Sequence, residues 1–205
     1  NCLANLNSII NKSTFENNKN NTVSDKKLVL ESIADITGTN TKAVVGSSGL
    51  SIQYAIMMGL IHHALENHKG KAIRFIVPPN CYGGTNDQAR RVAACIDNVE
   101  VIDLAVDSGN DMVSSINVVL DKIAKEDGIP YIIAEIPTNP RVEVPDLIQL
   151  EKVLSQERRT VTGELAIEPV FILDQTFCPN VHFLGKDKIL SKVRTISYVS
   201  GSKFP

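Results

Sequence analysis

The chain has 205 residues, of which 43% are hydrophobic and 21% are charged, and its formal net charge is −2 at pH 7. A chain of this length can bury a substantial core, which indicates an ordinary globular protein. The charge argues against a nucleic-acid partner, which would require clustered positive charge, and no apolar run reaches the length needed to cross a membrane.

The first part of the sequence is polar and rich in asparagine. Residues 16–21 lack an apolar period and the sequence does not begin with Met, so we expect residues 1–23 to form a trimmed and partly mobile N-terminal arm. Ser24 is a plausible N-cap for the first helix, whose apolar stripe begins at Leu28 and ends before Gly38. The remainder, residues 24–205, is predicted to form one domain that is incomplete in this chain.

Strand and helix patterns then alternate. Strands are predicted at Lys42–Val45, Ile73–Val77, Val99–Leu104, Tyr131–Ile136, Val170–Asp174 and Thr195–Val199. Helices are predicted at Leu50–Asn67, Thr85–Ile96, Val113–Lys125 and Leu147–Glu157, the first of them apolar on all sides and therefore buried. This rhythm predicts an α/β fold with a mostly parallel sheet, helices on both faces, and ligands at the carboxyl ends of the strands.

A glycine- and serine-rich turn precedes the first long helix. In Gly46-Ser47-Ser48-Gly49-Leu50 the glycines permit a tight turn, and the N–H groups of a helix start favour a phosphate. Taken in isolation, this motif is more simply an ordinary turn with a serine cap, and that is its preferred interpretation.

Two further turns have similar alternatives. Tyr82, before Gly83 and Gly84, can stack on a planar ring, and Asn139, in a proline-rich segment, can be aimed at a ligand. Taken singly, each is more simply a turn or a rigid loop. The four cysteines lack a CxxC pair and indicate reduced thiols in a cytoplasmic protein, and no metal site is predicted.

Asp174 and Lys203 carry more chemistry. A carboxylate that ends an apolar strand is costly to bury unless a cation, such as a protonated pyridine nitrogen, accompanies it. An arginine partner or a capping role is an equal alternative for Asp174. Lys203 follows Ser200, Gly201 and Ser202, whose hydroxyls and small size suit a phosphate beside the lysine, although the spacing is not that of a P-loop.

Five segments in order resemble the pyridoxal phosphate (PLP) dependent enzymes of cysteine and methionine metabolism, the cystathionine synthases and lyases. Ser48-Gly49-Leu50 is similar to that family's Ser-Gly-Met/Leu helix start, and Tyr82-Gly83-Gly84-Thr85 to its Tyr-Gly-Gly-Thr. The other three matching segments are Glu135-Ile136-Pro137-Thr138-Asn139-Pro140, Asp174-Gln175-Thr176-Phe177 and Ser200-Gly201-Ser202-Lys203.

The resemblance implies the large domain of a fold-type I PLP enzyme with PLP as cofactor. It implies that Lys203 holds the cofactor and moves the Cα proton, that Asp174 pairs with the pyridine nitrogen, and that Tyr82 stacks on the ring. Asn139 would contact the ring oxygen. The remaining implied cofactor contacts are Ser48, Gly49, Leu50, Thr176, Ser200 and Ser202.

The implied reaction is elimination or replacement at Cβ or Cγ of a sulfur amino acid or an activated homoserine. The implied partners are an amino-acid substrate and further copies of the chain in a dimer or tetramer. The family's Tyr-Ser-Arg segment is missing upstream, and Gln175 replaces the usual Asn. Because the family's small domain would follow Pro205, we expect an N-terminal half that is inactive alone.

Two other interpretations stay open. The chain can be a non-catalytic binding or assembly module that retains the fold. It can also be a nucleotide-binding domain that uses Gly46–Leu50, but the acidic residue at the required distance, Glu66, lies within the long helix. The nearly complete set of cofactor residues favours the PLP interpretation over both.

Overall fold

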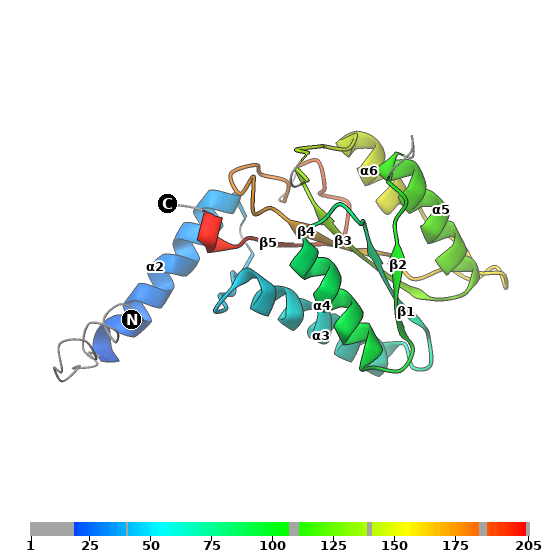
Figure 1. The fold of residues 1–205 in the computed structure, drawn as a ribbon, viewed down its shortest axis with the longest axis horizontal. Helices are drawn as coiled ribbons and strands as arrows, with labels where there is room; N and C mark the ends of the chain where they lie inside the picture. The colour runs from blue at the N-terminus through cyan, green and yellow to red at the C-terminus, as the bar shows by residue number, and fades with distance from the viewer. Residues whose placement is uncertain (1–18, 40, 107–110, 139–140, 185–187, 204–205) are drawn as a thin grey trace.

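The computed structural model describes residues 19–39, 41–106, 111–138, 141–184 and 188–203. These residues form an α/β fold built on a five-stranded sheet in the order β2-β1-β3-β4-β5, with every neighbouring pair parallel (Figure 1). The predicted fold class is therefore confirmed. No helix in the described part of the chain has the length and apolar character needed to cross a membrane.

The strands are short and apolar. They are β1 (Ile73–Val77), β2 (Val99–Asp103), β3 (Ile129–Glu135), β4 (Val170–Asp174) and β5 (Thr195–Tyr198). Every residue of the two strands β3 and β4 is buried, because helices cover both faces of the sheet. A parallel sheet covered in this way brings the carboxyl ends of neighbouring strands to one edge.

Two helices lie on each face of the sheet (Figure 1). The helices α3 (Gly49–Asn67) and α4 (Gly83–Ala94) contribute to one apolar cluster, and α5 (Met112–Lys125) and α6 (Leu147–Leu154) contribute to the other. Successive strand residues point to opposite clusters: Ile172 packs with the first, and Phe171 and Leu173 pack with the second.

Two elements lie outside this layered arrangement. The helix α2 (Lys19–Thr37) extends away from the sheet, and η1 (Gly201–Lys203) is a single 3-10 turn after β5 (Figure 1). The start of α2 corrects the sequence analysis, since Ser24 lies inside the helix and is not its N-cap. Backbone hydrogen bonds alone can extend a helix through polar residues, so no apolar period in the sequence marks its start.

The predicted strand Lys42–Val45 is wrong. The chain has no strand there, and Val44 and Val45 are exposed. Valine favours a strand only where a neighbouring strand pairs with it, and none does so here.

The prediction that the helix from Leu50 is buried on all sides is also wrong. The buried residues of α3 are Gln53, Met57, Ile61 and Ala64, one stripe that faces the sheet, while Tyr54 lies on an exposed face. Apolar composition alone therefore overstated the burial of this helix.

The predicted end of the last helix at Glu157 is corrected to Leu154. Arg158 explains this end, because its guanidinium donates to the carbonyl oxygens of Val153 and Gln156 and holds the chain in a turn. The boundaries of the other sheet strands and of the helices from α3 to α5 differ from prediction by at most two residues.

Candidate functional site

Three polar side chains form a transverse row at the carboxyl edge of the sheet. Glu135 ends β3, Asp174 ends β4 and Tyr198 ends β5, and Asp174 is the register partner of both neighbours. All three are buried. The residues two positions earlier on β3 and β4, Ile133 and Ile172, belong to the cluster beneath α3 and α4, so the row faces those helices.

The Asp174 carboxylate is held by a backbone N–H two residues further along the chain. Its Oδ1 accepts a hydrogen bond of 2.9 Å from the N–H of Thr176. The Oγ1 of Thr176 in turn accepts one of 3.0 Å from the N–H of Ser200. These two bonds join the end of β4 to the segment that follows β5, which brings two of the predicted motifs together.

The start of α3 lies against the same segment. A Cβ built on Gly49 would lie 2.8 Å from the Cβ of Ser200, so only glycine fits this approach. The helix start is fixed by a capping box, in which Ser48 accepts from the N–H of Ser51 and Ser51 accepts from the N–H of Ser48. Neither element alone would place these residues together.

Donors gather at this junction. Within the described residues, the N–H groups of Gly49 and Leu50 make no hydrogen bond to another protein group. The hydroxyls of Ser200 and Ser202 lie 3.0 Å apart. Unpaired N–H groups at a helix N-terminus beside two hydroxyls form a suitable environment for an anion such as phosphate.

Tyr82 is held at the start of α4 by a buried carboxylate. Its N–H donates to Oε2 of Glu135 at 3.1 Å, while its side chain is 52% exposed. A Cβ on Gly84 would lie 2.5 Å from the Tyr82 ring, so this glycine allows the ring to lie over the first turn of the helix. The exposed ring is available to contact a planar ligand.

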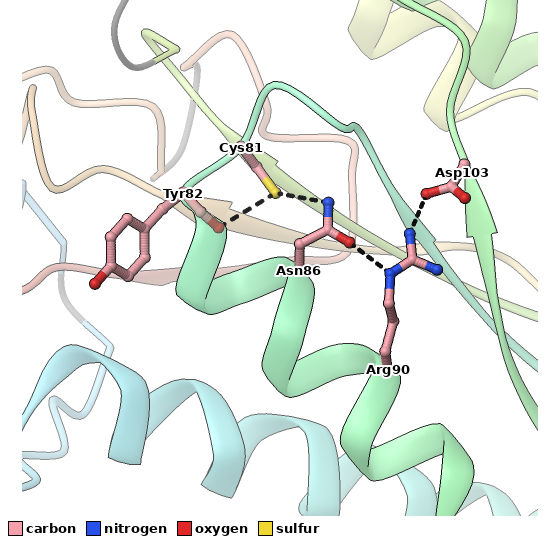
Figure 2. Close-up of polar contacts among 5 residues, drawn as sticks. All are labelled: Cys81, Tyr82, Asn86, Arg90 and Asp103. Carbon is pink, nitrogen blue, oxygen red and sulfur yellow. Dashed lines mark hydrogen bonds and ion pairs between the residues drawn. The ribbon is translucent and has the colours of Figure 1, made fainter.

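A chain of polar contacts runs outward from this point along α4 (Figure 2). The Cys81 thiol contacts the carbonyl oxygen of Tyr82 and the side-chain amide of Asn86. Asn86 accepts from Arg90, which pairs with Asp103 at the end of β2. The Tyr82 ring points away from these contacts (Figure 2).

The Cys81 thiol has low reactivity at neutral pH. Burial raises its pKa to about 12, and the negative charges of Glu135 and Asp174 act in the same direction. Since the thiolate is the reactive form, this cysteine is unsuited to nucleophilic catalysis at neutral pH.

A buried polar network lies under the row. The Oε1 of Gln53 accepts from Thr85 Oγ1 at 2.9 Å and from the Tyr198 hydroxyl at 3.1 Å. Burial raises the pKa of the Tyr198 hydroxyl, and the charge of Asp174 raises it further, so the phenol is neutral.

Sequence reasoning missed the roles of Gln53, Tyr198 and the carboxylate of Glu135 in this site. A signal was present for Gln53, which is a polar residue among apolar ones in the predicted buried helix.

Three further residues singled out in the sequence, Lys203, Asn139 and Gln175, differ in whether and where the structure places them. Lys203 lies in η1, exposed, with its N–H 3.4 Å from the carbonyl oxygen of Ser200. Asn139 lies outside the described residues. Gln175 is buried, donates to Val181, and accepts from Ser197, so the residue that replaces the expected Asn helps to hold the loop after β4.

Comparison with known proteins identifies similar folds but does not assign this chain to a family. No family model matches the sequence. None of the curated proteins compared matches it either.

Solved structures do match the fold. The crystal structure of the SepCysS–SepCysE N-terminal domain complex matches 86% of this chain and 42% of that chain, with a TM-score of 0.56 and 14% identity. The apo form of mouse CSAD matches 82% of this chain and 35% of that chain, with a TM-score of 0.55 and 15% identity.

The metB protein of Corynebacterium glutamicum matches less well, with a TM-score of 0.47, 18% identity, and coverage of 72% of this chain and 31% of that chain. The first two matches show that this chain has the α/β fold of PLP-dependent fold-type I enzymes. The chain spans less than half the length of each of these proteins.

Proposed function

We propose that this chain binds PLP at the carboxyl edge of its sheet and belongs to an enzyme that acts on amino acids. One observation carries the proposal: hydrogen bonds through Thr176 connect the buried Asp174 carboxylate to Ser200, which lies against Gly49 at the helix start. A partner for a pyridine nitrogen and a set of phosphate donors therefore belong to one connected unit.

The residues present fit the cofactor at both ends. The N–H groups of Gly49 and Leu50 and the hydroxyls of Ser200 and Ser202 would hold the phosphate. Asp174, buried in the middle of the transverse row, would keep the ring nitrogen protonated, because a buried carboxylate favours a cationic partner. The exposed ring of Tyr82 would stack on the pyridine.

When bound, PLP supplies an electron sink for the negative charge that develops at the substrate Cα. Lys203 would hold the cofactor and move the proton at Cα as general base and acid. Asp174 would orient the ring through its nitrogen. Thr176 would hold Asp174 in turn, and the proposed role of Asn139 is a contact with the ring oxygen.

We further propose that the reaction is elimination or replacement at Cβ or Cγ of a sulfur amino acid or an activated homoserine. The five motifs in order support this class. A homo-oligomer, dimer or tetramer, is supported by exposed apolar residues on α2, namely Val23, Leu28, Val29 and Ile36. The cytoplasm is the proposed location.

The second candidate is a non-catalytic binding or assembly module. It is favoured by the sequence of residues 18–24, which contains neither Tyr nor Arg where the family has its Tyr-Ser-Arg segment. It differs from the first candidate in one respect, since a module has no need to respond to an amino acid.

The two candidates are separated by the response of bound PLP to amino acids. We would load the protein with PLP, record its absorbance, and add L-cystathionine or an O-acylhomoserine, with Lys203→Ala as the control. A spectral change in wild type that is absent from the control supports the enzyme. Bound PLP that responds to no amino acid supports the module. That the 205-residue chain alone has no turnover stays a prediction, which measurable product from cystathionine would contradict.

A further inference from the structure

Gln53 is a polar residue in the middle of the buried stripe of α3. It is 1% exposed, and it lies one helical turn after Gly49. Burying a side-chain amide without hydrogen bonds is costly, so a glutamine in this position must be explained by its partners.

Those partners belong to two other elements. Thr85 of α4 and Tyr198 of β5 both donate hydroxyl protons to Oε1 of Gln53. The Nε2 of Gln53 donates to the carbonyl oxygen of Thr85 at 3.4 Å. All three side chains are buried. One amide thus joins α3, α4 and β5, which are far apart in the sequence.

Each of the three elements carries a different part of the proposed cofactor site. The start of α3 has the N–H groups of Gly49 and Leu50. Tyr82, which lies three residues before Thr85, directly precedes α4. Tyr198 is the register partner of Asp174 and precedes Ser200 by two residues. The hydrogen bonds of Gln53 therefore connect the elements that carry the phosphate-binding end of the proposed site to those that carry its ring-binding end.

We propose that Gln53 is a positioning residue that fixes the phosphate-binding end of the site relative to its ring-binding end. The inference rests on the proposed PLP function. A ligand that is bound at two ends gains its full affinity only when both ends are held at the correct separation, so Gln53 acts on their combination and on neither end alone.

The test compares Gln53→Met, which keeps the length and apolar packing of the side chain, with Gln149→Met on the exposed face of α6 as a matched control. Dissociation constants would be measured for PLP, for pyridoxal, which lacks the phosphate, and for inorganic phosphate. We expect Gln53→Met to weaken PLP binding by about tenfold or more. Binding of pyridoxal and of phosphate should change by less than about twofold, and Gln149→Met should leave all three constants as in wild type.

Equal losses for PLP, pyridoxal and phosphate would overturn the inference, because they would indicate a general structural role. An unchanged constant for PLP would overturn it too. Tyr198→Phe is the second variant, since it removes one donor with little change in volume. It should weaken PLP binding in the same selective way if Gln53→Met does not fold.

Amide hydrogen exchange of the protein without PLP tests the same link independently. Gln53→Met should speed exchange at residues 49–52, 82–86 and 198–202 together, and Gln149→Met should not. Faster exchange in α3 alone would overturn the inference. A wild-type chain that binds no PLP contradicts the proposed function, and the exchange data then still decide whether Gln53 couples the three elements.

Discussion

Gly49 and Ser200 lie so close that a Cβ on Gly49 would be 2.8 Å from the Cβ of Ser200, although 151 positions of sequence separate the two residues. The start of α3 and the segment after β5 therefore form one surface. This contact brings unpaired helix N–H groups beside two serine hydroxyls, and it depends on the absence of one side chain.

The first prediction concerns this glycine. Gly49→Ala should lower the free energy of unfolding by about 1–3 kcal/mol, because the added methyl group has no space. It should also weaken PLP binding. Urea denaturation and PLP titration measure the two effects.

Gly59 offers a matched control on the same helix, since a Cβ there would meet nothing within 4 Å. Gly59→Ala should raise the free energy of unfolding by up to about 1 kcal/mol through helix propensity. Equal effects of the two substitutions would contradict the account of the Gly49 contact.

The second prediction concerns the reactivity of two cysteines. Cys81 is buried with its pKa raised to about 12, while Cys95 is exposed. Iodoacetamide at pH 8 should therefore modify Cys95 in the native protein and leave Cys81 unmodified until the protein unfolds. Mass spectrometry of tryptic peptides gives the extent of each reaction. Modification of Cys81 at the rate of Cys95 would show that its thiol is accessible.

The third prediction concerns alkaline pH. The pKa of Cys81 is 9.0 in its ordinary state and about 12 in the folded protein, so between these values the folded state keeps a proton that the unfolded state loses. The free energy of unfolding should therefore fall as pH rises above about 9, by at most about 1.4 kcal/mol per pH unit from this group.

Cys81→Ala should make that decline shallower, whatever its effect on stability at pH 7. Part of the decline should remain above pH 10, because the pKa of Tyr198 is also raised. Denaturation curves at several pH values give the slopes. An identical slope in wild type and variant would contradict the raised pKa of Cys81.

The fourth prediction concerns an arginine near the amino ends of the strands. The Arg158 side chain is 8% exposed and donates to Asp121 and Asn117, each at 2.7 Å. Arg158→Met should lower the free energy of unfolding by about 1–2 kcal/mol, because it removes the hydrogen bonds of a buried guanidinium to Asp121 and Asn117. PLP binding by the folded fraction should be unchanged.

Arg91 is the exposed counterpart, paired with Asp87 four residues earlier on α4. Arg91→Met should cost less than about 1 kcal/mol, as is typical of surface ion pairs. If both substitutions cost the same, the network around Arg158 does not stabilise the fold as described.

The sequence predicted the sheet better than it predicted the site. Ile73–Val77 and Val170–Asp174 were placed to the residue, because continuous apolar runs mark strands that are buried on both faces. The strand predicted at Val44 and Val45 was wrong, because the strand preference of valine does not indicate whether a neighbouring strand is present to pair with it.

Within the site, the motifs around Gly49, Tyr82, Asp174 and Ser200 were visible because each is short and local. The bond from Tyr198 to Gln53 joins residues 145 positions apart, and no spacing in a single sequence reveals it. The same holds for Glu135 and the Tyr82 N–H, which meet only when the fold brings the end of β3 beside the residue that precedes α4. Contacts of this kind depend on tertiary structure and were therefore missed.

The most direct measurement is the position of the lysine that captures PLP. The protein would be mixed with PLP, reduced with borohydride, digested, and mapped by mass spectrometry, with Lys203→Ala as the control. The account predicts a pyridoxyl group on Lys203 that is lost in the control. A label on exposed lysines such as Lys188 and Lys192, equal in wild type and control, would contradict the claim that this edge of the sheet is a PLP site.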